Sequence, residues 1–111
     1  MTEYEVLYYI DDSGRDVVQD WINSLKDIKG RSIIRRRLLR LGEGNFGENH
    51  YSRDGVWELV INYGPGYRIY YSISGTKVIL LLCGGTKRGQ NRDIETAVKF
   101  LRKFKEDLNL K

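Results

Sequence analysis

The sequence contains little cysteine and little histidine, and this scarcity excludes several kinds of site. Cys83 is the only cysteine, so the chain cannot form an intramolecular disulfide. His50 is the only histidine, and the acidic residues are scattered along the chain. We therefore expect no bound metal and no cofactor. A single reduced thiol fits a cytoplasmic protein.

Long apolar runs are also missing. No stretch approaches the roughly 18 apolar residues that a membrane-spanning helix needs. The first ten residues, MTEYEVLYYI, lack the basic region that opens a signal peptide. We expect an unexported soluble protein without a membrane partner. The length fits a single domain over residues 1–111, and no repeat, low-complexity tract or linker interrupts it.

The positive charge is unevenly distributed along the chain. Residues 1–30 hold seven acidic and three basic side chains, whereas residues 31–111 hold sixteen basic and eight acidic ones. A positive surface of this kind suits a polyanion such as RNA. Ordinary solvated charge is the more common explanation of such a surface, and both interpretations stay open for the arginine-rich segment that contains Arg36.

Hydrophobic periodicity predicts one strand and three helices outside the centre of the chain. The strand covers residues 3–10, which are rich in tyrosine, valine and isoleucine. The first helix begins after a cap at Asp16, and a break near Lys29–Gly30 leads into the second. The last helix begins at a cap formed by Asn91 or Asp93.

The centre of the chain predicts an antiparallel meander of three strands. Turn signals at Gly64-Pro65-Gly66 and Ser74-Gly75 separate its apolar runs, which cover residues 57–63, 67–73 and 77–83. The glycine-containing segments on either side, 42–55 and 84–90, predict loops.

Turn lengths predict the register of this meander. A three-residue loop at 64–66 places Leu59 opposite Tyr71 on the core face. A two-residue turn at 74–75 adds three further side chains to that face, namely Val78, Leu80 and Leu82. Arg68 then projects from the opposite face, where it needs either an acid of its own chain or an anionic ligand.

The polar residues near this second face suit RNA better than other substrates. RNA carries its own nucleophile, the 2′-hydroxyl, so cleavage needs a base, a cation at the phosphate and an acid, without a metal. Arg68 can grip phosphate oxygens and Tyr70 can stack on a base. The same residues are equally explained if the tyrosines fill the core and Arg68 pairs with Glu58.

Five ordered segments resemble the short HigB-like "addiction module killer" branch of the RelE/ParE toxin superfamily. They are GNFGE (44–48), GVWEL (55–59), YGPGYRIYY (63–71), VILLLCGGTK (78–87) and DIETA (93–97). The resemblance covers nearly the whole chain. It implies an α+β (α/β) domain of RelE-like fold, with a twisted antiparallel sheet of about four strands against two N-terminal helices, plus a C-terminal helix.

The resemblance also implies a function. The chain is expected to be the toxin of a type II toxin–antitoxin module, bound and neutralised by a genetically linked antitoxin, which in HigA-type systems carries a helix-turn-helix. Well-known RelE and HigB members are ribosome-dependent mRNA endoribonucleases, also called mRNA interferases. They use metal-independent attack of the 2′-hydroxyl on the phosphate. Messenger RNA and the ribosome are therefore the expected partners.

Site residues follow from the motifs. The arginine of the GYR motif is Arg68, which is expected to contact the scissile phosphate. His50 and Glu58 are the candidates for the general base, and Lys87 or a tyrosine is the candidate for the acid. The expected RNA-binding residues are Arg88, Arg92, Tyr70, Lys77 and Arg36.

The sequence departs from the family pattern at several of these positions. Val60 stands where this branch usually has arginine, His50 where it has lysine, and Thr86 where it has aspartate. RelE itself has a tyrosine where this chain has Ile94. Two alternatives to a nuclease therefore remain: a ParE-like inhibitor that binds DNA gyrase, and a degenerate toxin that retains only antitoxin binding.

Overall fold

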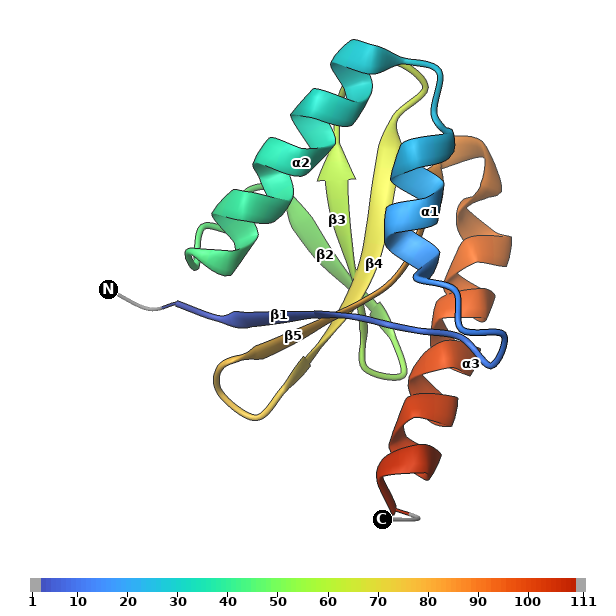
Figure 1. Ribbon diagram of the computed structural model, residues 1–111. Coiled ribbons are helices and arrows are strands. Elements are labelled where there is room, and N and C mark those ends of the chain that lie inside the picture. Colours follow the sequence, from blue (N-terminus) through green and yellow to red (C-terminus); the bar gives the residue numbers. More distant parts are fainter. Residues whose placement is uncertain (1–2, 110–111) are drawn as a thin grey trace.

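The computed structural model describes residues 3–109 as a five-stranded mixed sheet with helices on both faces (Figure 1). The strand order is β1-β5-β4-β3-β2; β1 runs parallel to β5, and the other neighbours are antiparallel. The strands are β1 (Glu5–Tyr8), β2 (Asn49–Arg53), β3 (Val56–Ile61), β4 (Tyr67–Ser74) and β5 (Val78–Thr86). The helices are α1 (Val17–Ser24), α2 (Ile28–Gly42) and α3 (Gln90–Asn109). The short 3-10 helix η1 (Lys87–Gly89) directly precedes α3.

This arrangement confirms an α+β fold and corrects the predicted sheet. The sheet is mixed instead of antiparallel, because the N-terminal strand joins β5 in parallel, with Glu5 beside Val78 and Tyr8 beside Leu81. It has five strands because residues 49–53, which were predicted to lie in a loop, form the edge strand β2.

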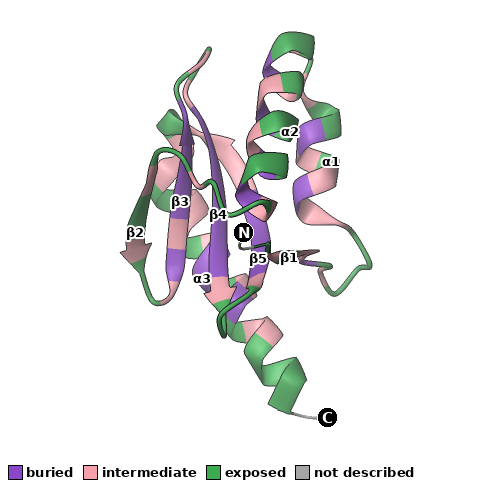
Figure 2. Cartoon of the chain, turned by 90° about the vertical axis from the view of Figure 1, so that its left-hand side faces the viewer, coloured by how far each residue is buried: buried purple, intermediate pink, exposed green. Residues whose placement is uncertain are grey.

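Two hydrophobic clusters lie on opposite faces of the sheet. Helices α1 and α2 lie side by side on one face, and α3 crosses the other (Figures 1 and 2). We call these the α1/α2 face and the α3 face. The core of the α1/α2 face includes Ile22, Ile34, Leu38, Leu59, Ile69 and Tyr71. The core of the α3 face includes Val56, Tyr70, Leu80, Leu82, Ala97 and Leu101.

Aspartate caps define the starts of both N-terminal helices. The predicted cap at Asp16 is confirmed, since its carboxylate accepts from the amide of Gln19 at 3.1 Å. The predicted break near Lys29–Gly30 is wrong: the break lies earlier, and Asp27 caps α2 by accepting from the amide of Gly30 at 2.8 Å. The second oxygen of Asp27 accepts from the Tyr67 hydroxyl at 2.8 Å, which fixes α2 to β4.

The observed register differs from the prediction by two residues between β3 and β4. Leu59 faces Ile69, because the connecting loop spans residues 62–66 instead of 64–66. A shift by an even number keeps every side chain on its predicted face. The next connection is one residue longer than predicted, since Ser74 pairs with Val78. This exchanges the faces, so Ile79 and Leu81, and not Leu80 and Leu82, lie on the α1/α2 face.

The end of β5 is ordered strand instead of the predicted flexible loop. Gly84, Gly85 and Thr86 pair with Ile69, Arg68 and Tyr67. Helix α3 follows η1 directly and starts at Gln90, so Asn91 and Asp93 lie inside its first turn instead of capping it. Within residues 3–109, no helix combines the length and the apolar composition that a bilayer crossing requires.

Candidate functional site

A buried ion pair lies on the α3 face, near one end of the sheet. The Nε of Arg68, on β4, lies 3.1 Å from Oε2 of Glu58, on β3, and the two side chains are only 10% and 7% exposed. We call this end the η1 end. It comprises the β3–β4 loop (residues 62–66), the end of β5 and the start of α3 (residues 84–93). The acid partner that Arg68 required is therefore supplied by the chain itself.

The guanidinium of Arg68 is fixed on one side and accessible on the other. Its Nη1 donates to the carbonyl oxygens of Gly66 at 3.1 Å and Tyr67 at 3.4 Å. Its Nε faces Glu58 without the geometry of a hydrogen bond. No described residue accepts a hydrogen bond from Nη2, and 10% of the Arg68 side chain remains exposed. One edge of a rigidly held cation is therefore available to a ligand.

Glu58 is surrounded by donors from three elements. Besides Arg68, the Gln90 amide donates to both carboxylate oxygens, at 3.1 Å and 2.8 Å, from the first residue of α3. The Tyr70 hydroxyl lies 3.4 Å from Oε2. Because both oxygens already accept, Glu58 is better placed to orient Arg68 than to abstract a proton from a substrate.

Tyr70 is fully buried, so it offers no ring surface to an RNA base in this conformation. Burial and the nearby Glu58 carboxylate raise the pKa of its phenol. The hydroxyl therefore stays protonated and remains a donor toward Glu58. Tyr70 acts in the structure as part of the support for the ion pair.

Lys87 and Arg68 meet around Gly66. The Lys87 amide donates to the Gly66 carbonyl at 2.8 Å, which holds η1 against the β3–β4 loop. Gly66 has a positive φ of 79°, and a Cβ at this position would lie 3.2 Å from Arg68 Nη1 and 3.3 Å from the Cβ of Lys87. Glycine thus allows the loop to lie close to both cationic residues.

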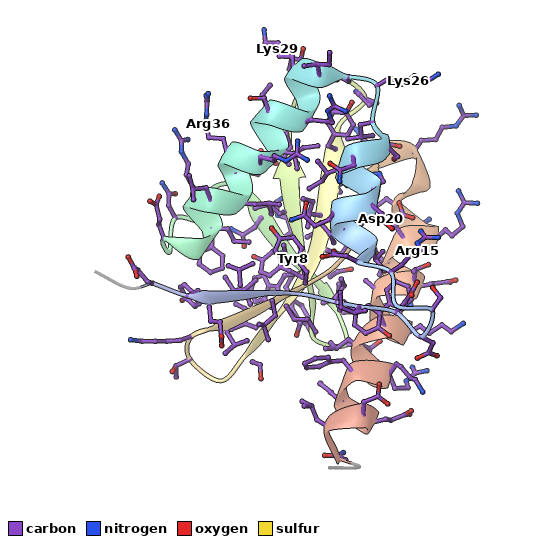
Figure 3. The ribbon with its side chains drawn as sticks, viewed as in Figure 1. Tyr8, Arg15, Asp20, Lys26, Lys29 and Arg36 are labelled. Atoms are coloured by element: carbon purple, nitrogen blue, oxygen red, sulfur yellow. The ribbon has the colours of Figure 1, made fainter. Side chains whose placement is uncertain are left out.

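The basic residues that the sequence predicted fall into two groups. Lys87, Arg88 and Arg92 are exposed at the η1 end, and Lys87 lies next to Arg68 through Gly66. Lys77 is exposed in the β4–β5 turn, at the opposite end of the sheet (Figure 1). Arg36 points away from the sheet on the outer side of α2 (Figure 3). The structure therefore does not bring Lys77 and Arg36 to the site.

His50 lies on β2, the edge strand, and not on a loop. Its backbone pairs with Glu58, so the two side chains share the α3 face. Its side chain is 61% exposed, and Nε2 lies 3.6 Å from Oε2 of Glu48. Glu48 also accepts from the amide of Asn62 at 2.6 Å. His50 thus stands beside the ion pair, separated from Arg68 by the width of β3.

Val60, which stands where the toxins that this sequence resembles usually have arginine, is an apolar neighbour of Arg68. Val60 faces Arg68 across β3 and β4, and its side chain is buried at 3% exposure. Its carbonyl accepts from Arg37 at 2.8 Å, a contact that joins α2 to β3. The residue opposite Arg68 on β3 is therefore apolar, and it supplies no second cation beside the guanidinium.

Sequence reasoning missed Gln90 and Asp93 as site residues. Gln90 was assigned to a flexible connection and Asp93 to a helix cap, yet both face the site from the first turn of α3. The available signal was the adjacent pair Gly84–Gly85 together with Gly89, since these glycines allow α3 to begin close to β5. Among the described residues, no group of three metal-ligating side chains is close enough to hold an ion.

Comparison with known proteins places the chain in a family without describing its activity. No protein-family model matches the sequence. Over 77 residues, which make up 69% of this chain and 78% of the relative, it is 40% identical to an uncharacterized protein of Haemophilus influenzae (strain ATCC 51907 / DSM 11121 / KW20 / Rd). The chain belongs to the same family as this uncharacterized protein.

Proposed function

We propose that this protein is the toxin of a type II toxin–antitoxin module, with a RelE-like fold, and that it cleaves messenger RNA on the ribosome. The observation that carries the proposal is the guanidinium of Arg68, which Glu58 and the β3–β4 loop hold in place while its Nη2 has no acceptor among the described residues. The ordered motifs of the chain, which resemble HigB-like toxins, support the same function.

The exposed charges around Arg68 favour RNA as the ligand. Lys87, Arg88 and Arg92 provide flexible cations beside a fixed one, which suits a phosphate backbone that must be both attracted and oriented. Arg68 stabilises the charge that develops on the phosphate when the 2′-hydroxyl attacks. Lys87, which lies next to Arg68 through Gly66, is the candidate proton donor to the leaving oxygen.

His50 is the better candidate for the general base. It is accessible, it shares the α3 face with Glu58, and an imidazole nitrogen can accept a proton from a 2′-hydroxyl. Glu58 is assigned a positioning role, because its carboxylate is occupied by Gln90 and Arg68. His50→Gln should therefore slow cleavage without altering the stability of the protein.

Primer extension on a translated message tests this proposal directly. Purified protein is added to a reconstituted translation mixture, and the same RNA is incubated without ribosomes. New 5′ ends that appear only on the translated message would support the proposal. Intact message in both reactions, from protein shown to be folded by circular dichroism, would contradict it.

A second candidate, a toxin that binds DNA gyrase without chemistry, is favoured by one specific observation. The buried carboxylate of Glu58 neutralises Arg68, and Val60 supplies no second cation. Inhibition of gyrase supercoiling by protein that leaves translated mRNA intact would identify this function. If both assays are negative, restoring a cation with Val60→Arg tests for a degenerate toxin, which should then regain cleavage.

The expected antitoxin is also testable. A type II toxin requires a partner that neutralises it, and acidic or amphipathic segments fit the basic helices of this protein. Co-expression of the neighbouring gene should restore the growth of cells that produce the protein. If no neighbouring gene restores growth, the assignment to a toxin–antitoxin module fails.

A further inference from the structure

An open pocket of about 480 Å³ lies at the η1 end, along the end of β5 and the start of α3. Strand β1 pairs with β5 only from Val78 to Leu81, so the edge of β5 beyond this point has no neighbouring strand. Trp21 of α1 forms one wall and Arg88, Arg92 and Asp93 form the other, above Gly84 and Gly85 of β5.

Trp21 offers an aromatic surface to this pocket. The six-membered part of its indole covers Gly84, where a Cβ would collide with the ring. Tyr67 supports the ring from the side, with centroids 6.0 Å apart and planes at 73°. Trp21 remains half-buried, so part of this firmly held ring is available for contact with a flat ligand.

Asp93 places a carboxylate that accepts no hydrogen bond from a described side chain in the wall of the pocket. Its Oδ2 lies over Gly85, where a Cβ would collide with it, and beside Gly89, where a Cβ would lie 3.1 Å away. No described side chain donates to this carboxylate or forms an ion pair with it. Burial raises its pKa, an effect that Arg92 partly opposes. A ligand with N–H groups would satisfy it.

The pocket is connected to Arg68 through Gly85, which lines the pocket on β5 and pairs with Arg68 on β4. Arg68 and Gly85 face each other across β4 and β5, and Asp93 lies directly over Gly85. The side chains of Arg68 and Asp93 therefore both lie on the α3 face of neighbouring strands. Arg88 and Arg92 border the pocket on the solvent side, where the next phosphates would lie.

We propose that this pocket binds the base of the nucleotide next to the phosphate held by Arg68, and that Asp93 selects guanine there. This inference rests on the proposed RNA-cleaving function. Guanine alone among the four bases presents two adjacent N–H donors, N1–H and N2–H, to a carboxylate. Trp21 lines the same pocket and offers an aromatic surface to a base.

The other bases fit this arrangement less well. Adenine and cytosine each place one amino group beside a ring nitrogen acceptor, which would face the second oxygen of Asp93. Uracil has a single N–H between two carbonyl oxygens, both of which the carboxylate repels. A matched bidentate pair discriminates by about tenfold or more, so the expected preference for guanine is measurable with mononucleotides.

Trp21 provides the readout for this test. The chain has two tryptophans, and Trp57→Phe leaves Trp21 as the sole reporter while keeping an aromatic ring at the distant start of β3. In this variant, guanosine 5′-monophosphate should change Trp21 emission in a saturable manner. Adenosine, cytidine and uridine monophosphates should bind at least about tenfold more weakly.

Two substitutions locate the effect at Asp93. Asp93→Asn in the reporter variant replaces one acceptor by a donor and should weaken guanosine monophosphate binding about tenfold. Gly85→Ala keeps the carboxylate but displaces it, because the new Cβ would occupy the position of Oδ2, and it should have the same effect. Lys77→Ala, at the opposite end of the sheet, is the matched control and should bind normally.

The outcomes separate this inference from the proposed function. Equal binding of all four mononucleotides, or unchanged guanosine monophosphate binding in both substituted proteins, would overturn the inference, even if translated mRNA is cleaved. Guanine-selective binding that both substitutions abolish would support it, even if no cleavage is observed and the nuclease proposal fails.

Discussion

The two faces of the sheet are both buried, yet they are stabilised differently. The α1/α2 face is filled by aliphatic and aromatic side chains, and its main polar link is the bond from Tyr67 to Asp27. The α3 face combines apolar residues with the buried polar side chains of Glu58, Arg68 and Ser72. Figure 2, which colours the chain by burial, shows the central strands as buried along most of their length.

This difference indicates where the function lies. A buried ion pair is weak evidence for stability, because the cost of desolvating both charges offsets their attraction. An apolar pair at positions 58 and 68 would stabilise the sheet at least as well. The retention of Glu58, Arg68 and Gln90 at the open end of the α3 face is therefore better explained by a task at the surface than by the fold.

Glu58 and Leu59 are neighbours on β3 whose side chains point to opposite faces of the sheet. Truncating each of them should show most strongly how the two faces differ in stability. Glu58→Ala leaves Arg68 as an unpaired buried charge and should lower the free energy of unfolding by about 3–5 kcal/mol. Leu59→Ala opens a cavity on the other face and should cost about 2–5 kcal/mol. Urea denaturation followed by circular dichroism measures both values.

The double substitution Glu58→Met with Arg68→Met distinguishes the causes. Replacing the pair by apolar side chains should restore most of the stability that Glu58→Ala loses. Adding Arg68→Met to Leu59→Ala should give no such recovery. If Glu58→Ala alone costs less than about 1 kcal/mol, the pair is not buried as described.

Adjacent glycines on β5 offer the next comparison. Gly84→Ala forces a Cβ against the supported ring of Trp21 and should destabilise the protein by about 1–3 kcal/mol. Gly85→Ala meets only the end of the Asp93 side chain, which can rotate away, so its cost should be smaller. Thermal unfolding measures the difference, and equal losses at the two positions would contradict the assignment of their faces.

Two tyrosines on β4 allow a test with pH. Tyr67→Phe removes a 2.8 Å bond to Asp27 and should cost about 1 kcal/mol. Tyr70→Phe should cost less, because its hydroxyl lies 3.4 Å from Glu58, which keeps its other donors. Burial and then Asp27 raise the pKa of Tyr67 to about 12 from 10.0.

The sign of the pH effect follows from this shift. The folded protein retains the Tyr67 proton between its unfolded and folded pKa values, so the contribution is complete below pH 10 and is lost as the pH rises toward 12. Tyr67→Phe should therefore flatten the fall in stability over this range. An unchanged alkaline profile in the variant would contradict the prediction.

Surface cations should produce the smallest changes in stability and a selective change in binding. Lys87→Ala and Lys77→Ala should each alter unfolding by less than about 0.5 kcal/mol, since both side chains are exposed. Only Lys87→Ala should weaken binding to single-stranded RNA and reduce the salt dependence, by about 0.7 in the logarithmic slope. Filter binding at several salt concentrations tests this, and equal effects would place RNA elsewhere.

Much of the fold was predictable from the sequence, because hydrophobic periodicity and the residues typical of turns and helix caps are local signals. The existence of the central hairpins, the Asp16 cap and the side of the sheet on which Arg68 lies were predicted correctly, whereas the registers of the hairpins were not. Strand β2 was missed because residues 49–53 are polar and mostly exposed. Asp54-Gly55, with φ values of 52° and 84°, was the available signal for that hairpin.

The site was less predictable, since it depends on turn lengths and on contacts between distant segments. One additional residue in the β4–β5 turn changed which β5 side chains face each helix layer. The contact of Gln90 with Glu58 spans 32 positions and has no local pattern. The partner of Arg68 was one of two interpretations left open, and only the register and the burial decide between them.

The central claim is that Arg68 acts on messenger RNA with its accessible guanidinium edge. Cleavage rates on a translated message, compared between Arg68→Lys and Lys77→Ala, test it most directly. Lysine keeps the charge opposite Glu58 and the fold, but it lacks the planar guanidinium group that donates two parallel hydrogen bonds to a phosphate. The account predicts about 100-fold slower cleavage by Arg68→Lys and normal cleavage by Lys77→Ala. Equal rates for Arg68→Lys and the unchanged protein would contradict it.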